Sequence, residues 1–193
     1  MRIGVLAVQG AFAEHIAALR KLAVEALPVR QPLELISLDG LIIPGGESTS
    51  ISRLMLDYDL AGEIKKMAEK GLPMLGTCAG MILLARELSD SGVKPLGLMD
   101  IMVRRNAFGR QRESFEAELS IPALGEDPFP GVFIRAPIIE QVNGNVEILT
   151  RLDNGTIVAA RQEKLLAAAF HPELTDDLRF HRYFMQVVKG GNL

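Results

Sequence analysis

One cysteine lies in a segment with the features of a reactive thiol. The segment Gly76–Gly80 reads Gly-Thr-Cys-Ala-Gly, with a short apolar run before it and a helix-like stretch, Ala79–Leu88, after it. A nucleophile on a tight strand-to-helix turn needs small neighbours, because larger side chains would crowd the turn and block the substrate. The start of a helix also favours thiolate over thiol. The pattern predicts that Cys78 is a nucleophile; the alternative is a buried cysteine that only packs.

A histidine and a carboxylate follow a second predicted strand. His171 comes directly after the apolar run Leu165–Phe170, and Glu173 lies two residues further on. Pro172 restricts the backbone of His171 to extended conformations. Alternate residues of an extended chain point the same way, so we expect the imidazole and the carboxylate to meet. The carboxylate would fix the tautomer of the ring and leave its other nitrogen facing a thiol. Together with Cys78, this set is suited to acyl transfer through a covalent intermediate.

The other two histidines are assigned to different surroundings. His15 lies on a predicted helix beside Glu14, and His181 lies near the end of the chain beside Arg182 and Tyr183. Lone polar residues on helices are usually solvated. We therefore expect His15 at the solvated surface and His181 at the surface or at an interface.

A pair of glycines follows a third predicted strand. Residues 44–48 read Pro-Gly-Gly-Glu-Ser and come directly after the run Leu41–Ile43. Glycines let backbone N–H groups approach a ligand closely, so the amides of Gly46 and Ala79 could form an oxyanion hole. A phosphate-binding loop is one alternative, but the Gly-x-x-x-x-Gly-Lys-Ser/Thr spacing is absent from the sequence. A plain turn is the other alternative.

The elements that must position these residues alternate between strand and helix in the first half of the chain. Continuous apolar runs indicate strands covered on both faces, and apolar residues at helical spacing indicate the helices between them. The expected strands are Ile3–Val8, Ala26–Arg30, Leu41–Ile43, Met74–Leu75 and Leu165–Phe170, and the expected helices are Ala11–Leu22, Ser48–Leu56, Leu60–Lys70, Ala79–Leu88 and Asp176–Lys189.

The second half of the chain changes character. Short β-like stretches are expected at Asp100–Arg104, Ser114–Ser120, Gly131–Arg135, Val146–Arg151 and Ile157–Arg161. Asn143-Gly144 and Asn154-Gly155 lie between some of them and are hairpin signals. The predicted fold is therefore α/β: a three-layer α/β/α sandwich with a mostly parallel central sheet and an antiparallel β extension.

Bulk composition narrows the class of protein. At 193 residues, with 48% hydrophobic and 23% charged residues, the chain is predicted to form a single globular domain over residues 1–193. A net charge of −3, without a cluster of Lys and Arg, argues against nucleic-acid binding. No run approaches the roughly 20 apolar residues of a membrane span. One cysteine cannot form an intramolecular disulfide, so we expect a cytoplasmic protein.

The three motifs together resemble the class I glutamine amidotransferases, whose catalytic set is Cys–His–Glu. Within that superfamily the chain is similar to the glutaminase subunits of pyridoxal 5′-phosphate synthases, whose architecture is flavodoxin-like. The similar stretches are distributed along nearly the whole chain: Val8–Ala11, Pro44–Thr49, Arg105–Asn106, Phe108–Gln111, Ser114–Glu116, Gly131–Pro137 and His171–Thr175.

The resemblance implies a role for each matched residue. Cys78 would be the nucleophile, His171 the general acid and base, and Glu173 the carboxylate that orients the ring. Gln9 would lie near the oxyanion hole and rearrange when a partner docks. Arg104 lies where the family usually has an acidic residue. The position of the Arg-Asn pair in the family's pattern favours Arg105 as the arginine that faces the substrate. The residues that would contact or frame glutamine are Gly46, Glu47, Ser48, Arg105, Ile134 and Arg135.

The resemblance also implies a reaction and a partner. L-glutamine and water would give L-glutamate and ammonia through a γ-glutamyl thioester on Cys78, with no metal or cofactor. The partner would be the synthase subunit, which makes pyridoxal 5′-phosphate from a pentose phosphate and a triose phosphate by lyase chemistry. The two subunits would form a hetero-oligomer with a protein tunnel for ammonia.

Three alternatives remain at this point. A glutaminase subunit of histidine or tryptophan biosynthesis would share the catalytic set, but the Gly-Glu-Ser-Thr and Phe-Ile-Arg-Ala-Pro stretches argue against it. A cysteine peptidase or stress protein on a similar fold commonly has its histidine soon after the cysteine, whereas Ala79 and Gly80 follow here and His171 is far downstream. A non-catalytic subunit would have no need of an intact Cys–His–Glu set.

Overall fold

The computed structural model describes residues 1–90, 92–109 and 113–190. Arg110 and Gln111, which belong to one of the stretches that carry the resemblance, lie outside the described residues. The helices are α1 (Phe12–Lys21), α2 (Ser48–Asp57), α3 (Leu60–Glu69), α4 (Ala79–Leu84) and α5 (Arg179–Val188), with 3₁₀ turns η1 (Pro32–Leu35), η3 (Pro122–Leu124) and η4 (Pro172–Leu174). The strands are β1 (Arg2–Leu6), β2 (Glu25–Val29), β3 (Gly40–Ile43), β4 (Met74–Thr77), β5 (Ala85–Leu88), β6 (Met99–Arg104), β7 (Ser114–Leu119), β8 (Phe129–Ile134), β9 (Ile138–Val142), β10 (Glu147–Arg151), β11 (Ile157–Gln162) and β12 (Leu165–Ala168).

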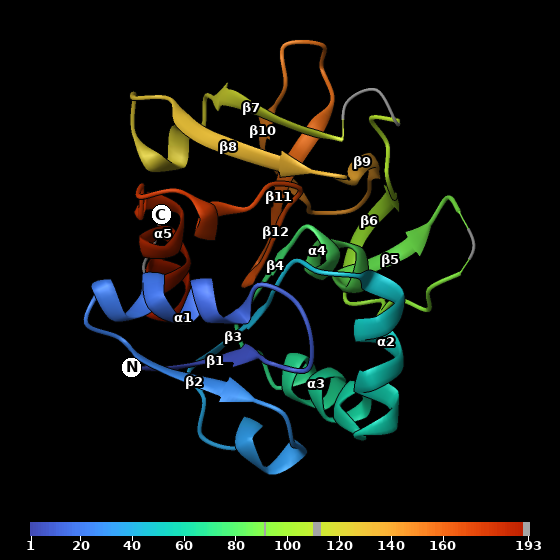
Figure 1. Ribbon diagram of the computed structural model, residues 1–193, viewed down its shortest axis with the longest axis vertical. Coiled ribbons are helices and arrows are strands. Elements are labelled where there is room, and N and C mark those ends of the chain that lie inside the picture. Colours follow the sequence, from blue (N-terminus) through green and yellow to red (C-terminus); the bar gives the residue numbers. More distant parts are fainter. Residues whose placement is uncertain (91, 110–112, 191–193) are drawn as a thin grey trace.

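A mostly parallel sheet forms the centre of the molecule (Figure 1). Within the described ranges, its strands follow the order β2-β1-β3-β4-β12-β11-β9-β6-β5, with β10 paired to β11. The first five of these strands run parallel to one another. The order β2-β1-β3-β4 is that of flavodoxin-like folds. The predicted α/β fold is confirmed.

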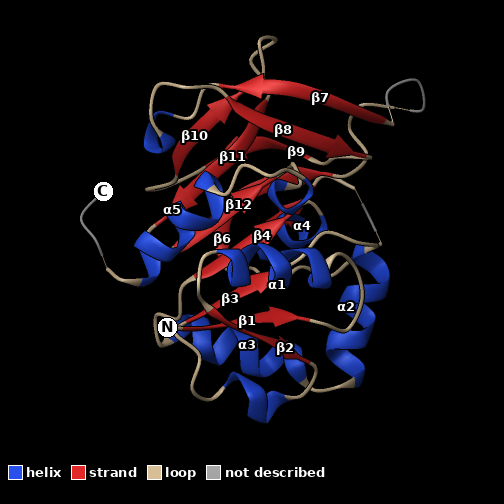
Figure 2. Cartoon of the chain, turned by 60° about the vertical axis from the view of Figure 1, so that its left-hand side comes forward, coloured by secondary structure: helices blue, strands red, loops and turns tan. Residues whose placement is uncertain are grey.

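Helices cover both faces of the parallel strands, as the sequence predicts. In Figure 2, α1 and α5 lie in front of these strands and α3 lies behind them. Every residue of β3 and β4 is buried, which explains why their sequences are apolar without alternation. The antiparallel extension consists of β9, β10 and β11 at the side of the sheet and a separate pair, β7 and β8. None of the helices in the described ranges combines the length and the apolarity needed to cross a membrane.

Several predicted boundaries were wrong. The expected helix Ala79–Leu88 divides into α4 and the strand β5, because residues from Ala85 onward pair with β6. The expected helix from Asp176 begins at Arg179, whose backbone N–H donates to the side chain of Asp177. The strand β9 was not predicted from the sequence. Asn154-Gly155 does join two paired strands, but Asn143-Gly144 does not, because β10 pairs with β11 and not with β9.

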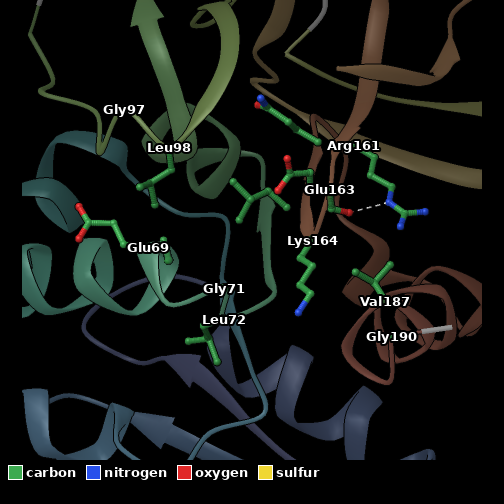
Figure 3. A pocket seen from close by; sticks show the side chains of 13 residues that line it. Glu69, Gly71, Leu72, Gly97, Leu98, Arg161, Glu163, Lys164, Val187 and Gly190 are labelled. Carbon is green, nitrogen blue, oxygen red and sulfur yellow. Dashed lines mark hydrogen bonds between the residues drawn. The ribbon is translucent and has the colours of Figure 1, made fainter. Parts of the chain in front are cut away.

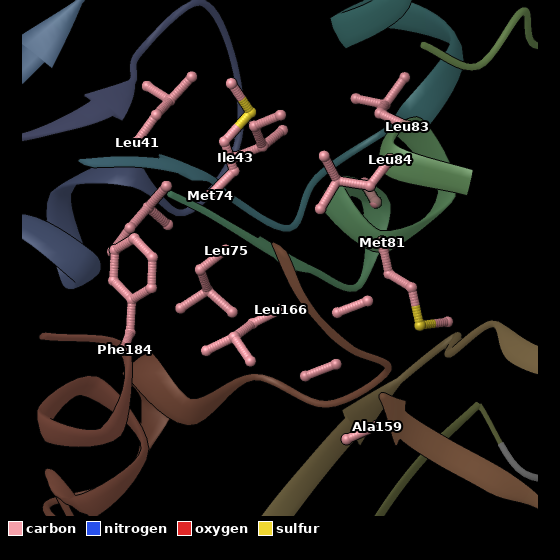
Figure 4. Packing of buried hydrophobic residues seen from close by; sticks show 14 of the residues in the cluster. Leu41, Ile43, Met74, Leu75, Met81, Leu83, Leu84, Ala159, Leu166 and Phe184 are labelled. Carbon is pink, nitrogen blue, oxygen red and sulfur yellow. The ribbon is translucent and has the colours of Figure 1, made fainter. Parts of the chain in front are cut away.

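The turn between β4 and α4 depends on two glycines. A Cβ atom on Gly80 would collide with the backbone carbonyl of Ile43 at the end of β3, and one on Gly76 would collide with the backbone of Gly80. This close approach brings α4 onto the sheet, where all six of its residues are buried. Figure 4 shows side chains of β3, β4, β12, α4 and α5 in one cluster, among them Leu41, Leu75, Leu166, Leu84 and Phe184.

This packing predicts opposite effects of the same substitution at two glycines. Gly80→Ala should destabilise the protein by about 1–3 kcal/mol, the usual cost of overpacking, because a backbone atom blocks the new methyl group. Gly62→Ala, within α3 and with no atom in the way, should be neutral or stabilise the protein by up to about 1 kcal/mol. Urea denaturation of both variants measures the difference. Equal free energies of unfolding for the two variants would contradict the close approach.

Candidate active site

Four neighbouring parallel strands end at one cavity. Gln9 follows β1, Gly46 follows β3, Cys78 follows β4 and His171 follows β12. Binding sites of open α/β sheets lie at this carboxyl edge. The cavity has a volume of about 430 Å³ and is lined by Gln9, Gly46, Glu47, Ser48, Cys78, Ile82, Arg105, Asn106, Ile134, Arg135 and His171.

Cys78 occupies the turn predicted for a nucleophile. Its backbone has φ 48° and ψ −103°, a conformation that a non-glycine residue rarely adopts and that costs about 1–3 kcal/mol. Its backbone N–H donates to the carbonyl of Ala168 at 2.8 Å, which attaches the turn to β12. The thiol faces the cavity, which His171 also lines, and donates a hydrogen bond to the carbonyl oxygen of Ile134 at 3.8 Å.

His171 and Glu173 form a short hydrogen bond. His171 Nδ1 lies 2.7 Å from Glu173 Oε1, and the Glu173 side chain has no exposed surface. The expected contact is present, but its geometry is not the extended one that we predicted, because Glu173 lies in the single 3₁₀ turn η4. The backbone N–H of His171 donates to Val132 of β8, which holds the loop in place.

The electrostatics of this pair follow from its burial and its partners. Burial alone would lower the pKa of His171, but hydrogen bonds to Cys78 and Glu173 raise that pKa to about 10. Burial would likewise raise the pKa of Glu173, but His15 and His171 hold it below its ordinary value. At neutral pH, His171 is therefore protonated and Glu173 is ionised.

The two adjacent arginines have separate surroundings. Arg105 lines the cavity and its Nε lies 2.7 Å from Asp90 Oδ2. Arg104 forms an ion pair with Glu140, 3.0 Å between Nε and Oε1, and is not among the residues that line the cavity. Of the two arginines, Arg105 is therefore the one that lines the cavity, at the position that the sequence favours for the arginine facing the substrate.

Glu47 and Gln9 stabilise the glycine-rich segment. The Glu47 carboxylate caps α2 by accepting the backbone N–H groups of Thr49 and Ser50, at 3.0 and 2.7 Å. The side-chain hydrogen bond from Ser50 and these backbone bonds lower the pKa of Glu47 to about 2. Gln9 Oε1 accepts the backbone N–H of Glu47 at 3.0 Å and lies close to Gly46. Gln9 therefore bridges the ends of β1 and β3.

Two features of the cavity escaped the sequence analysis. Asn106 and Arg135 have positive φ angles of 46° and 42°, and both line the cavity with Cys78. Strained backbone of this kind is common at functional sites. Asn106 belongs to a stretch that carries the resemblance, but it was not predicted as a site residue. Ile82 forms an apolar part of the wall. Ala79, predicted to contribute an amide, is buried and is not among the lining residues.

Comparison with known proteins identifies the family. The model of the SNO glutamine amidotransferase family matches residues 5–190. The chain belongs to this family. It is 60% identical over 191 residues to a protein of Dehalococcoides mccartyi (strain CBDB1) named pyridoxal 5′-phosphate synthase subunit PdxT, with 98% of each chain covered. A protein of the same name from Pelotomaculum thermopropionicum is 58% identical, with 96% of this chain and 94% of the relative covered.

Solved structures agree with the fold of this glutamine amidotransferase. A crystal structure of a glutamine amidotransferase matches with a TM-score of 0.92 and 48% identity, over 97% of this chain and 98% of the other. The structure of PurLQS from Thermotoga maritima matches with a TM-score of 0.67 at 17% identity, over 98% of this chain and 97% of the other. At that identity, only the fold is shared.

A larger cavity of about 810 Å³ lies at the opposite edge of the sheet (Figure 3). Gly71 and Leu72 line it just before β4 begins, and Lys164 and Leu165 line it where β12 begins. It contains none of the residues predicted for the site, so size alone does not locate the chemistry of this family member. Within the described ranges, no group of three or more His, Cys, Asp or Glu side chains could hold a metal ion.

The surface assignments of His15 and His181 were wrong. Both rings are fully buried, because α1 and α5 lie side by side over the same face of the sheet. His15 Nδ1 lies 3.0 Å from His181 Nε2, and His15 Nε2 lies 3.1 Å from Thr77 Oγ1. Burial lowers the pKa of His15, and burial with the nearby His15 lowers the pKa of His181 to about 3. Both rings are neutral at pH 7.

The buried His181 predicts a loss of stability in acid. The pKa of His181 is about 3 in the folded protein and about 6.5 in the unfolded chain. Between these two pH values, the ring is protonated in the unfolded chain and neutral in the folded protein. The free energy of unfolding should fall as the pH decreases from about 6.5, by up to about 1.4 kcal/mol per pH unit for this ring. Urea denaturation at pH 7, 6 and 5 gives the free energy of unfolding at each pH, and this free energy should fall less steeply with decreasing pH in His181→Gln than in the wild type. The same dependence on pH in both proteins would contradict a neutral, buried His181.

Proposed function

We propose that this chain is the glutaminase subunit of a pyridoxal 5′-phosphate synthase. It hydrolyses L-glutamine to L-glutamate and ammonia, and the ammonia is used by a synthase subunit in vitamin B6 biosynthesis. Family membership and nearly full-length relatives named as that subunit support the pathway. The observation that supports the chemistry is that Cys78 and His171 line the same cavity and that His171 is hydrogen-bonded with Glu173 at 2.7 Å.

The proposed reaction begins with attack by the Cys78 sulfur on the side-chain amide carbon of glutamine. A carbon–sulfur bond forms, and the carbonyl oxygen becomes an oxyanion that accepts hydrogen bonds from the amides of Gly46 and Ala79. Nδ1 of His171 is hydrogen-bonded with Glu173. The other ring nitrogen, Nε2, can therefore donate its proton to the departing nitrogen of the substrate. The carbon–nitrogen bond breaks, ammonia leaves, and a γ-glutamyl thioester remains on Cys78.

Hydrolysis of the thioester completes the cycle. His171, now neutral, takes a proton from a water molecule as the water oxygen attacks the thioester carbon. The carbon–sulfur bond breaks, glutamate leaves, and Cys78 regains its thiolate beside a protonated His171. Glu173 stays ionised and holds the ring in one tautomer throughout.

The rest of the cavity is proposed to bind the amino-acid end of glutamine. Arg105 and Arg135 line it, and a guanidinium group pairs well with an α-carboxylate. Ser48 and Ile134 complete the wall, while Glu47 acts mainly by capping α2 and fixing the loop that carries Gly46.

The partner is proposed to be the synthase subunit, in a hetero-oligomer with a tunnel for ammonia. Free ammonia would be protonated in water, so an enclosed path preserves the nucleophile. Gln9 is the proposed link to the partner, because its hydrogen bond to the Glu47 amide joins the loops that frame the oxyanion hole. We propose a single domain over residues 1–193, acting in the reducing cytoplasm, where the Cys78 thiol stays free.

Removal of the nucleophile tests the proposed function. Cys78→Ala should abolish ammonia release from glutamine, because no thioester can form, while the melting temperature and binding to the synthase subunit stay near those of the wild type. Ammonia is measured for each protein alone and together with the synthase. If the synthase does not change the activity of the wild type, the proposed pathway is wrong. If the Cys78→Ala variant still hydrolyses glutamine, Cys78 is not the nucleophile.

The two neighbouring arginines provide a matched pair for the binding site. Arg105→Ala should raise KM for glutamine by about tenfold or more, as expected when a hydrogen bond to a charged group is lost. Arg104→Ala removes the same charge outside the cavity and should leave KM within about twofold, since exposed ion pairs contribute little. Steady-state kinetics with the synthase present measures both. Equal effects on KM would show that general charge, and not position, is responsible.

A further inference from the structure

A chain of buried polar groups continues behind Glu173, away from the cavity. Glu173 Oε1 is used by His171, while Oε2 lies 3.2 Å from Nε2 of His15. The other nitrogen of His15 lies 3.0 Å from His181 Nε2. The side chains of Glu173 and His15 have no exposed surface, and His181 is fully buried. The series therefore runs from α5 through α1 to η4 and ends at His171.

The ionised carboxylate decides where the protons lie in this series. A buried carboxylate needs hydrogen-bond donors on its oxygens, and an ionised one can only accept. Glu173 Oε2 has no hydrogen bond of good geometry among the described residues, and Nε2 of His15 lies 3.2 Å from it. A hydrogen on that nitrogen would supply the carboxylate oxygen with the donor that it needs. The same nitrogen is hydrogen-bonded with Thr77 Oγ1 at 3.1 Å, and this oxygen also accepts the backbone N–H of Gly45 at 3.1 Å. A hydroxyl oxygen has two lone pairs, so Thr77 can accept from both nitrogens, which is compatible with a hydrogen on His15 Nε2.

The remaining ring nitrogens follow from that assignment. A neutral His15 with hydrogen on Nε2 has an acceptor at Nδ1, so His181 must donate from its own Nε2. His181 Nδ1 is then an acceptor, and it has no hydrogen-bond partner among the described residues. Burial and the nearby His171 lower the pKa of His15, whereas Glu173 and Glu14 raise it. Burial has the largest effect, so the pKa stays below its ordinary value and the ring is neutral at pH 7.

We propose that His15 is a positioning residue for the proposed glutaminase reaction. It donates from Nε2 to Glu173 Oε2, in a tautomer that the ionised carboxylate selects and that leaves His15 Nδ1 to accept from His181, and so aims Glu173 Oε1 at the ring of His171. His15 touches neither the cavity nor the substrate and acts only through Glu173. The kinetic consequence rests on the proposed function, whereas the proton positions do not.

The proton positions can be measured directly, because the chain contains only three histidines. ¹⁵N-detected NMR of the full chain at pH 7 separates a ring protonated at Nε2, one protonated at Nδ1 and one protonated at both. We expect His15 and His181 as neutral rings with hydrogen on Nε2. A His15 ring protonated at Nδ1, or at both nitrogens, would overturn the proposal, whatever the enzyme assays give.

Paired variants test the consequence for the reaction, with the synthase subunit present. His15→Leu should lower kcat by roughly 10- to 100-fold, the loss expected for a hydrogen bond to a charged group, with KM within about twofold. The acid limb of its pH–rate profile should move to higher pH, because Glu173 loses a group that keeps it ionised. His15→Gln places an amide N–H near the same oxygen and should restore part of both.

The control is Arg20→Gln, an exposed change on the same helix, which should leave kcat and the pH profile unchanged. Equal losses in His15→Leu and His15→Gln with an unmoved acid limb would mean that His15 only fills space, and would overturn the positioning role. If the wild-type complex releases no ammonia, the proposed function fails, and the NMR measurement alone decides the proton positions.

Discussion

The burial of the Glu173 carboxylate is the interaction on which the arrangement of the site depends. A charge without exposed surface is stable only when hydrogen-bond donors reach its oxygens. One donor, His171, comes from the same loop, and His15 from α1 lies 3.2 Å from the other oxygen. The fold therefore has to bring α1, η4 and the end of β12 together. Cys78 and Glu173 together raise the pKa of His171 against the effect of burial.

Backbone strain at the cavity is a second constraint. Cys78, Asn106 and Arg135 all have positive φ angles and all line the cavity. Each such residue costs of the order of 1–3 kcal/mol and persists only where its surroundings fix it. At Cys78, these surroundings are the close packing of Gly80 against Ile43 and the buried cluster shown in Figure 4. Rigid strands beneath the turn thus hold the thiol toward the cavity.

Much of this could be predicted from the sequence because the relevant signals are local. Apolar runs and glycine-rich turns located β1, β3, β4 and β12, and the ends of these strands identified the residues that meet at the cavity. Long-range pairing was less visible: β5 looks helical from its own residues and becomes a strand only beside β6. The burial of His15 and His181 was missed for the same reason. Each lies on an amphipathic helix, and only the packing of α1 against α5 encloses both rings.

The central claim is that Cys78 forms a covalent bond with the side-chain carbon of glutamine. The most direct test is mass spectrometry after incubation, in the presence of the synthase subunit, with a glutamine analogue that carries a diazoketone in place of the amide. We predict a single adduct on the peptide that contains Cys78, formed more slowly when glutamine is added as a competitor. An unmodified Cys78, or labelling that glutamine does not slow, would contradict the account.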